Sequence, residues 1–393
     1  MTSYRYLIVG GGMTGDAACK GIRSIDPDGS IALVGDEPDP PYARPPLTKG
    51  LWLGKEESSI WRGTEDEGVD LHLGRTIVSL DLDAHTATDD RGDTYGYDRL
   101  LLATGGRPRH LPGAPEGVVH YRTLADYHTL RAAAAEGTRV AVIGGGFIGS
   151  ELAAALASNG CAVTMIFPEE AIGTRLFPRE LALSLNDYYR EKGVELVAGG
   201  LVGGVERRDG GYRVTVDGGG AFDADVVVAG LGIVPRDELA ADSGMATDNG
   251  IPVDDRGRVA GHDDVFAAGD VARFPARDLG RELRVEHEDH AKSHGRQVGR
   301  NMAGADEPYD HLPFFYSDLF ELGYEAVGEL DSRLETVAEW AEPHRKGVVC
   351  YQDAEGRPRG FLLWDVWGKV DAATDLIRAA APVGNERLRE LLG

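Results

Sequence analysis

The sequence contains little cysteine and no long apolar run. Its three cysteines, Cys19, Cys161 and Cys350, are scattered and form no CxxC pair. This spacing excludes a disulfide framework and a redox-active dithiol, and burial is the expected fate of Cys19 and Cys161. No apolar run approaches the ~20 residues that span a bilayer, and an expected strand begins close to Met1. We therefore expect no membrane insertion, no signal peptide and a cytoplasmic location.

Basic residues are also in deficit. The chain of 393 residues has 41 Lys plus Arg against 65 Asp plus Glu, which gives a formal net charge of −24. Such a charge repels nucleic acid and anionic membrane surfaces, so neither is an expected partner. An acidic surface that serves only solubility is the simplest explanation of this balance. The length suits two or three domains.

Glycine, by contrast, is arranged in a repeated pattern. The motif GxGxxG occurs at Gly10, Gly12 and Gly15, and again at Gly144, Gly146 and Gly149. Each copy follows an apolar strand and precedes a run that favours helix. This arrangement is typical of loops that bind the pyrophosphate of a dinucleotide at a helix N-terminus. Two purely structural turns are the alternative.

An acidic residue completes each copy. In the first, a strand at 6–9 and a helix at 12–25 lead to a strand at 30–34 and then Asp36. In the second, a strand at 139–143 and a helix at 147–158 lead to a strand at 162–167 and then Glu169. Both acids lie about 20 residues beyond the last glycine, where a carboxylate binds the ribose hydroxyls. Two dinucleotide sites are therefore predicted.

The remaining sequence suggests how these units are assembled. Segments 226–232 and 265–270 each have the form of a buried strand, and 290–302 resembles a helix. From Pro308 onward, aromatic and polar residues alternate as in an antiparallel sheet. We predict a split first dinucleotide domain (1–113 and 237–307), an inserted second domain (114–236) and a C-terminal domain (308–393).

Four segments show a resemblance to a known family: Pro40 to Lys49, Ala103-Thr104-Gly105-Gly106, Gly149-Ser150-Glu151 and Ala267-Ala268-Gly269-Asp270. They resemble the FAD-dependent, NADH-using ferredoxin reductases and the related apoptosis-inducing factor. Segments 284–291 and 315–328, and Phe167-Pro168-Glu169, are most similar to apoptosis-inducing factor. The resemblance covers nearly the whole chain.

The resemblance implies an α/β fold with two Rossmann-like, glutathione-reductase-like domains and a C-terminal α+β domain with an antiparallel sheet. FAD would occupy the first domain and NADH the second. A flavin accepts the two electrons of a hydride and releases them singly, which suits a [2Fe–2S] ferredoxin as the partner. No metal site is implied, and the protein would be a monomer or a redox-dependent homodimer.

Residues of the FAD site follow from the matched motifs. Gly10, Gly12 and Gly15 would hold the FAD pyrophosphate, with Ala103, Thr104 and Gly105 beside them. Asp36, or Glu37 as the near alternative, would bind the ribose. Asp270 would bond the ribityl chain, and its alternative role is a helix N-cap.

The resemblance also places two cations at the flavin ring. Arg44 and Lys49 would face the flavin, with Lys49 paired to Glu151, so that the ammonium stabilises charge on the reduced ring. A surface lysine and an exposed helical glutamate are the alternatives when each residue is considered alone.

Residues of the NADH site follow in the same way. Gly144, Gly146 and Gly149 would hold the second pyrophosphate. Glu169 would bind the adenosine ribose and repel a 2′-phosphate, which favours NADH over NADPH. Arg175 is a nearby basic residue, which would oppose this preference by attracting a 2′-phosphate. Phe147 would cover the nicotinamide site, or would pack under the helix.

Two residues depart from the family pattern. Glu288 and Tyr316 stand where ferredoxin reductases usually have tryptophan, which gives less aromatic cover near the flavin. An acidic ferredoxin would also need a local basic patch, for which Arg345, Lys346, Arg357 and Arg359 are candidates.

Two alternatives therefore stand beside the ferredoxin reductase: an NADH reductase of quinones or other diffusible acceptors, and a redox-switched interaction module. A flavin monooxygenase is not indicated, because the sequence has no FxGxxxH-type motif.

Overall fold

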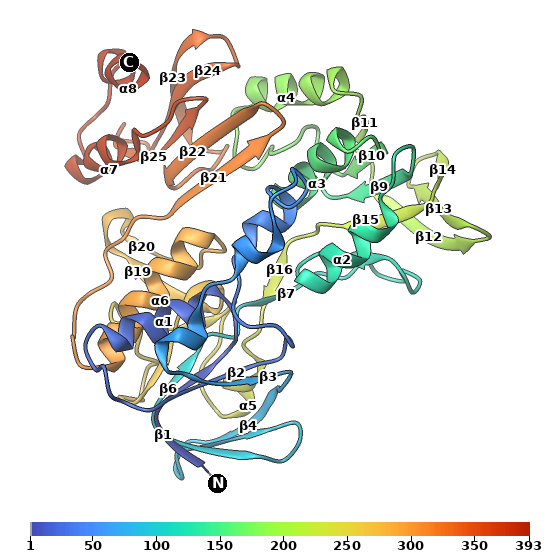
Figure 1. The fold of residues 1–393 in the computed structure, drawn as a ribbon. Helices are drawn as coiled ribbons and strands as arrows, with labels where there is room; N and C mark the ends of the chain where they lie inside the picture. Colours follow the sequence, from blue (N-terminus) through green and yellow to red (C-terminus); the bar gives the residue numbers. More distant parts are fainter. Residues whose placement is uncertain (1) are drawn as a thin grey trace. The chain divides into compact units, whose positions relative to one another are not determined.

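The computed structural model describes residues 2–393, and these form two compact units (Figure 1). Unit 1 consists of three segments: residues 2–43, Glu57–Arg107 and Val234–Pro313. Unit 2 takes Arg44–Glu56, Pro108–Ile233 and Phe314–Gly393. The chain passes from one unit to the other near two short strands, β7 (Gly106–Pro108) and β16 (Ile233–Pro235). The three-domain division stays a prediction, whereas the α/β fold class is confirmed.

The main sheet of unit 1 has the strand order β3-β2-β1-β6-β5-β4, with β18 also paired to β6. Strands β3, β2, β1, β6 and β18 run parallel, and β6, β5 and β4 are antiparallel. The strands are β1 (Thr2–Val9), β2 (Ile31–Gly35), β3 (Asp70–Leu73), β4 (Ile77–Asp81), β5 (Thr86–Asp89), β6 (Thr94–Leu102) and β18 (Val265–Ala267). The carboxyl ends of β1 and β2 lead to the first glycine loop and to Asp36 respectively, as in a dinucleotide-binding fold.

Two long helices of unit 1, α1 (Met13–Arg23) and α6 (Glu288–Met302), lie side by side (Figure 1). Glycines permit this close approach. A Cβ on Gly21 would lie 2.2 Å from the carbonyl oxygen of Arg296, and one on Gly299 would lie 2.2 Å from that of Ala18. Helix α6 is therefore fixed against the helix that follows the first glycine loop.

Shorter elements complete unit 1. A small sheet has the order β17-β19-β20. The elements are α5 (Glu238–Asp242), β17 (Ile251–Pro252), β19 (Ala272–Ala276), β20 (Arg281–Leu283) and the 3₁₀ helices η2 (Glu57–Ile60), η3 (Thr64–Glu67), η4 (Gly269–Val271) and η5 (Arg277–Leu279).

The dinucleotide region of unit 2 is built on a wholly parallel sheet with the order β11-β10-β9-β15-β8. A three-stranded antiparallel sheet, β12-β13-β14, lies next along the chain. The elements are η1 (Pro45–Thr48), β8 (Val119–His120), α2 (Leu124–Ala133), β9 (Arg139–Ile143), α3 (Phe147–Ser158), β10 (Ala162–Phe167), α4 (Arg179–Glu191), β11 (Glu195–Ala198), β12 (Val202–Arg208), β13 (Gly211–Val216), β14 (Ala221–Ala224) and β15 (Val226–Ala229).

The C-terminal part of unit 2 is the predicted antiparallel sheet, with the order β21-β22-β25-β24-β23. Its elements are β21 (Phe314–Leu319), β22 (Leu322–Gly328), β23 (Glu335–Glu342), β24 (Lys346–Gln352), β25 (Pro358–Trp364), α7 (Val370–Ala379) and α8 (Asn385–Leu392). Strand β21 is at the edge of this sheet and pairs with β22 on one side.

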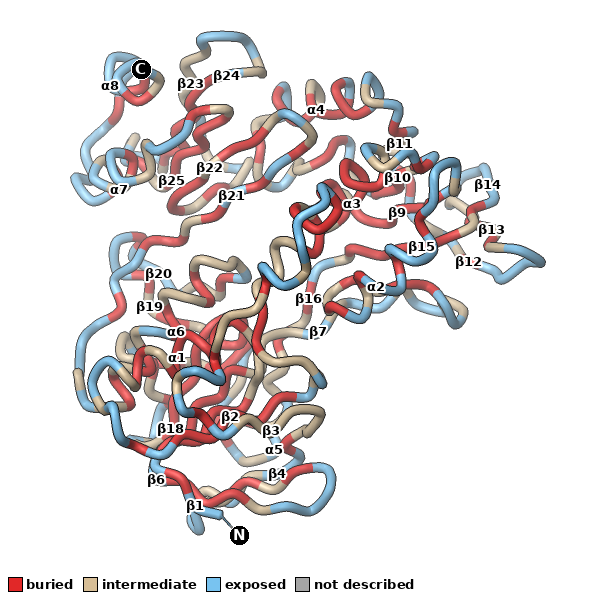
Figure 2. The backbone as a smooth tube through the Cα atoms, viewed as in Figure 1, coloured by how far each residue is buried: buried red, intermediate tan, exposed pale blue. Residues whose placement is uncertain are grey.

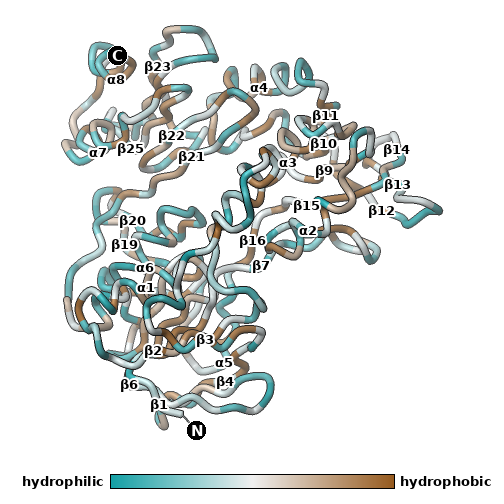
Figure 3. The backbone as a smooth tube through the Cα atoms, in the orientation of Figure 1, coloured by the Kyte–Doolittle hydropathy of each residue, from teal (hydrophilic) through white to brown (hydrophobic). Residues whose placement is uncertain are grey.

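Apolar strands form the cores of both units. The central strands of the parallel sheet in unit 2, β9 and β15, are buried along almost their whole length (Figure 2), and hydrophobic residues follow the same strands (Figure 3). A parallel sheet covered on both faces requires such continuous apolar runs. None of the helices in residues 2–393 is long and apolar enough to cross a lipid bilayer.

Most predicted elements are present, and the differences are local. Strand β9, helix α3 and strand β10 have the predicted bounds. The strand expected over 226–232 ends at Ala229, and Gly230 packs against the second glycine loop, where a Cβ would approach the amide nitrogen of Gly149 to 2.9 Å. The strand expected over 265–270 ends at Ala267, and Asp270 belongs to η4 instead.

Candidate functional site

The first glycine loop has the geometry of a pyrophosphate cradle. Gly10 has φ of +130°, and a Cβ there would lie 2.1 Å from the carbonyl oxygen of Ala103. A Cβ on Gly15 would lie 2.2 Å from the carbonyl oxygen of Gly10. Gly12, the N-cap of α1, faces open space and makes no side-chain capping bond. The amides at the start of α1 are therefore left for an anion, and the loop fits a dinucleotide.

Predicted residues of unit 1 gather around Arg236, which the sequence did not single out. Its guanidinium forms an ion pair of 2.5 Å with Asp36. Its carbonyl oxygen accepts a hydrogen bond of 2.6 Å from Thr104, and its N–H donates to the carbonyl oxygen of Gly105 at 2.9 Å. Glu37, the alternative acid, accepts a hydrogen bond of 2.5 Å from the hydroxyl of Tyr42. Arg236 thus contacts three predicted residues, Asp36, Thr104 and Gly105. The roles of Asp36 and Glu37 stay predictions.

Asp270 lies beside the first glycine loop. The preceding residue, Gly269, packs so tightly on α1 that a Cβ would lie 2.2 Å from Oγ1 of Thr14. Asp270 is buried inside η4, whose N-cap is Ala268. The alternative role of Asp270 as a helix N-cap is therefore wrong, while its bond to a ribityl chain stays a prediction. Glu288, the first residue of α6, pairs with Lys292 at 3.0 Å.

The second glycine loop repeats the geometry of the first. A Cβ on Gly144, where φ is +120°, would lie 2.4 Å from the carbonyl oxygen of Gly230. A Cβ on Gly149 would lie 2.0 Å from that of Gly144, and Gly146 faces open space as the N-cap of α3. Unit 2 therefore holds a second cradle of the same kind.

Glu169 follows the second strand of this unit and pairs with Arg175 at 3.0 Å. The side chain of Arg175 is 85% exposed, so it is free of other packing constraints. Phe147, at the start of α3, packs edge to face on Phe315 with ring centres 5.4 Å apart. Both roles considered for Phe147, cover of the nicotinamide site and packing under the helix, stay predictions.

Lys49 and Glu151 meet inside unit 2, as the resemblance predicted. Nζ of Lys49 lies 3.2 Å from Oε1 of Glu151, and the two side chains are only 12% and 9% exposed. The alternatives, a surface lysine and an exposed helical glutamate, are therefore wrong. Segment 44–56 belongs to the same compact unit as Glu151. Arg44, in that segment, donates to the carbonyl oxygen of Arg122 at 2.9 Å.

Four further residues surround the pair. Thr48 Oγ1 donates to Oε2 of Glu151 at 2.5 Å, and Ser317 Oγ donates to Oε1 at 2.6 Å. The Tyr316 ring lies under the Lys49 ammonium at 4.1 Å, and the Asp318 carboxylate is 3.8 Å from it. Thr48 and Ser317 were not predicted, although both directly neighbour predicted residues in the chain.

The three thiols are not available for exchange chemistry. Cys19, Cys161 and Cys350 are all buried and unpaired. Burial raises the pKa of each thiol, that of Cys350 to about 12. Because the thiolate is the reactive form, none of these residues is suited to disulfide exchange near neutral pH.

Three of the four candidate basic residues for partner docking are already paired with acids. Arg345 pairs with Glu191 at 3.3 Å, Arg359 with Glu329 at 2.8 Å, and Arg357 with Asp353 at 2.9 Å. These cations therefore do not form the unopposed basic patch that an acidic partner would favour.

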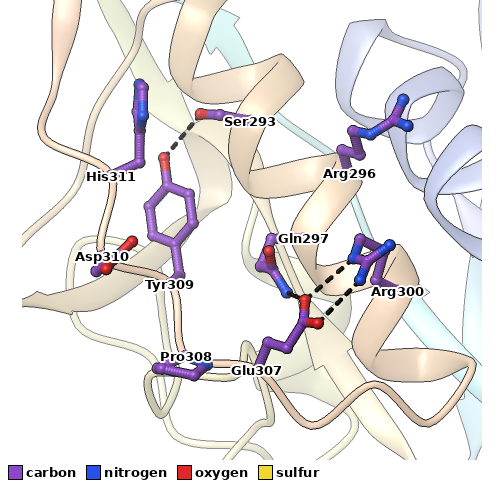
Figure 4. A pocket seen from close by; sticks show the side chains of 9 residues that line it. All are labelled: Ser293, Arg296, Gln297, Arg300, Glu307, Pro308, Tyr309, Asp310 and His311. Atoms are coloured by element: carbon purple, nitrogen blue, oxygen red, sulfur yellow. Dashed lines mark hydrogen bonds and ion pairs between the residues drawn. The ribbon is translucent and has the colours of Figure 1, made fainter. Parts of the chain in front are cut away.

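A cavity of about 510 Å³ lies in unit 1, along one side of α6 (Figure 4). Its wall is polar. Glu307 forms an ion pair of 2.9 Å with Arg300 and accepts a hydrogen bond of 3.0 Å from the side chain of Gln297. None of the predicted site residues lines it. The cavity is therefore separate from the two cradles.

Comparison with known proteins identifies the class that this fold and these cradles define. The family model "Pyridine nucleotide-disulphide oxidoreductase" matches residues 4–295, and the chain belongs to that family. A second model, "Apoptosis-inducing factor, mitochondrion-associated, C-term", matches residues 298–347. The predicted class, an NAD(P)H-dependent flavoprotein reductase with FAD and NADH as cofactors, is confirmed.

Individual relatives cover almost the whole chain. It is 32% identical to the anthranilate 1,2-dioxygenase system ferredoxin–NAD(+) reductase component of Burkholderia cepacia, over 99% of this chain and 98% of the relative. It is 32% identical to apoptosis-inducing factor 1, mitochondrial, of Dictyostelium discoideum, over 95% and 78%. Among solved structures, the covalent putidaredoxin reductase–putidaredoxin complex aligns with a TM-score of 0.92 at 28% identity, over 99% and 96%.

Proposed function

We propose that this protein transfers a hydride from NADH to FAD and then passes electrons one at a time to a small iron–sulfur protein of the ferredoxin class. The proposal is supported by the relative from Burkholderia cepacia, whose name describes a ferredoxin–NAD(+) reductase component. It is supported further by the structural neighbour that was solved as a complex of a reductase with putidaredoxin.

One observation carries the proposal: the buried Lys49–Glu151 ion pair stands directly behind the second glycine loop, in a chain whose thiols are all buried. Glu151 belongs to α3, the helix that begins at this loop. A buried ammonium held by a carboxylate is suited to stabilise negative charge that develops nearby, and it needs no thiol to do so. The pair therefore suits a flavin reductase that does not act through a disulfide.

The chain's own residues then have these proposed roles. Bound FAD supplies the conversion of one two-electron transfer into two single-electron transfers. Lys49 faces the flavin and stabilises its reduced charge, while Glu151 holds the ammonium in place. Gly10, Gly12 and Gly15 hold the pyrophosphate of FAD, and Gly144, Gly146 and Gly149 hold that of NADH. Glu169 accepts hydrogen bonds from the adenosine ribose and excludes a 2′-phosphate.

A small diffusible oxidant is the second candidate acceptor. The net charge of −24 and the pairing of Arg345, Arg357 and Arg359 with acids weaken attraction to an acidic protein partner. Among the relatives, monodehydroascorbate reductase 3 of Arabidopsis thaliana is 33% identical over 83% of this chain. The cytoplasmic location and the monomer or redox-dependent homodimer stay predictions.

A panel of acceptors separates these functions. The FAD protein is reduced with one equivalent of NADH without oxygen and is then mixed with a [2Fe–2S] ferredoxin, with benzoquinone or with air-saturated buffer. Fast reoxidation by ferredoxin alone supports the proposal. Fast reoxidation by quinone alone would instead establish the diffusible acceptor. A flavin that stays reduced with every acceptor would contradict both and favour the redox-switched interaction module.

A further inference from the structure

We infer that Thr48 and Ser317 are positioning residues that fix the Glu151 carboxylate against Lys49. The inference rests on the proposed role of Lys49 at the flavin. It adds that a short 3₁₀ helix, η1, and an edge strand of the C-terminal sheet, β21, together determine how that lysine is presented. Neither hydroxyl belongs to a glycine loop, and neither was predicted from the sequence.

Both carboxylate oxygens of Glu151 are held by hydrogen bonds. Oε2 accepts a hydrogen bond of 2.5 Å from Thr48, and Oε1 accepts one of 2.6 Å from Ser317. Oε1 also faces Nζ of Lys49 at 3.2 Å. Hydroxyl-to-carboxylate bonds of this length are in the short, charge-assisted class. Rotation of the carboxylate would break both of them, so its orientation is fixed from two sides.

The two hydroxyls and the carboxylate that they bond are all buried. Ser317 is 1% exposed, and Thr48 and Glu151 are each 8% exposed. Two fully buried tyrosines, Tyr189 and Tyr324, lie near enough to Glu151 that its charge, after burial itself, raises the pKa of both hydroxyls. A carboxylate in such a place is costly unless its oxygens are bonded. The two hydroxyls supply bonds that water cannot readily replace.

The neighbours of Ser317 in β21 contact Lys49. Tyr316 and Asp318 flank Ser317, and their side chains are on the opposite, exposed face of the strand. The Tyr316 carbonyl oxygen lies 3.4 Å from Nζ of Lys49, its ring lies 4.1 Å away, and the Asp318 carboxylate lies 3.8 Å away. Three consecutive residues of β21 thus touch the ion pair, with Ser317 on the acid and its neighbours on the lysine.

Loss of either hydroxyl should therefore weaken the function of the pair without weakening NADH binding. We expect Ser317→Ala and Thr48→Val each to slow flavin reduction about tenfold, the ratio that corresponds to one charge-assisted hydrogen bond. The concentration of NADH at half-maximal rate should stay within about twofold of the wild-type value, because both hydroxyls bond the Glu151 carboxylate and neither is proposed to bind NADH. Ser317→Thr and Thr48→Ser, which keep the hydroxyl, should restore most of the rate.

The test is stopped-flow reduction of the FAD protein by NADH, with each variant made alone and in a Glu151→Gln background. Thr215→Val is the matched control, since it removes a hydroxyl of unit 2 that bonds the Gly204 carbonyl oxygen at 3.1 Å. If Ser317 and Thr48 act through Glu151, their loss should slow the wild type but add nothing to Glu151→Gln. If Ser317→Ala fails to retain FAD, Thr48→Val alone decides the result.

Two results would overturn the inference, and they are distinguishable. Slow reduction in Glu151→Gln with wild-type rates in Ser317→Ala and Thr48→Val would remove the positioning role and leave the proposed function intact. Wild-type rates in both Lys49→Ala and Glu151→Gln would show that the pair has no part in hydride uptake, and the inference would fail together with that part of the proposed function.

Discussion

Nζ of Lys49 lies 3.2 Å from Oε1 of Glu151, although the two residues come from distant parts of the sequence. The contact joins the segment that follows the first dinucleotide unit to the helix that opens the second. Glu151 is buried and the Lys49 side chain is only 12% exposed, so the pair is held by the fold and is not an incidental surface contact.

Replacing Lys49 with Ala should lower the midpoint potential of the flavin and slow its reduction by NADH roughly 10- to 100-fold, because a charge that stabilises the reduced ring is lost. Glu151→Gln should slow the same step, and the double variant should resemble the worse single variant. Potentiometry and stopped-flow absorbance measure both effects. Lys55→Ala is the matched control, since Lys55 is exposed in the same segment. Independent, additive effects would contradict a functional pair.

Glu169 should determine the choice of nucleotide. Wild-type protein should have a higher kcat/KM with NADH than with NADPH, and Glu169→Gln should reduce this preference at least about tenfold by removing the repulsion of a 2′-phosphate. In that variant Arg175, released from its 3.0 Å ion pair, should attract the phosphate. The control is Glu170→Gln at the next position, where the acid pairs with Arg179 instead. A wild type that prefers NADPH would refute the role of Glu169.

Asp270 should be needed to retain FAD. Asp270→Ala should raise the dissociation constant of FAD about tenfold, because a buried acceptor beside the first glycine loop is lost. Fluorescence of released flavin during dilution measures this change. Asp263→Ala, at an exposed position in the same unit, should bind FAD as the wild type does. Equal retention in both variants would remove Asp270 from the site.

Buried histidines should make stability depend on pH. Burial lowers the pKa of His287 to about 4 and that of His294 to about 3, and it lowers the pKa of His290 as well. The unfolded chain binds protons at these residues below about pH 6.5, whereas the folded chain does not until lower pH. The free energy of unfolding should therefore keep its full value above pH 6.5. Below that pH it should fall by about 1.4 kcal/mol per pH unit for each histidine.

The contribution of one histidine can be isolated. His294→Asn cannot bind the extra proton, so its free energy of unfolding should decline less steeply than that of the wild type between pH 6.5 and 5. Urea titrations at three pH values in this window measure the two slopes. The window lies above the range in which most carboxylates titrate. Parallel slopes would show that His294 is not protonated on unfolding.

Much of the fold followed from the sequence because its signals are local. Strand, glycine loop, helix and acid occur in register around Gly10 and again around Gly144, and both units were found where they were expected. Helix α3 has the predicted bounds. The end of β15 was misplaced, because the pattern of residues 226–232 does not show where strand pairing stops.

The site was predictable only in part. Contact between Lys49 and Glu151 was expected from the family resemblance, whereas Thr48 and Ser317 were overlooked. A serine or threonine hydroxyl that bonds a carboxylate more than one hundred positions away resembles any other hydroxyl in sequence. Arg236 was missed for the same reason, because its ion pair with Asp36 depends on the packing of distant segments.

Anaerobic stopped-flow mixing of the purified FAD protein with one equivalent of NADH shows whether NADH reduces the bound flavin. The absorbance band of oxidised flavin should disappear in a single fast phase with one NADH consumed per FAD, and Lys49→Ala should slow this phase at saturating NADH. A protein that binds no flavin, or whose flavin NADH does not reduce, would contradict the account. Reduction at the wild-type rate in Lys49→Ala would contradict the proposed role of the Lys49–Glu151 pair.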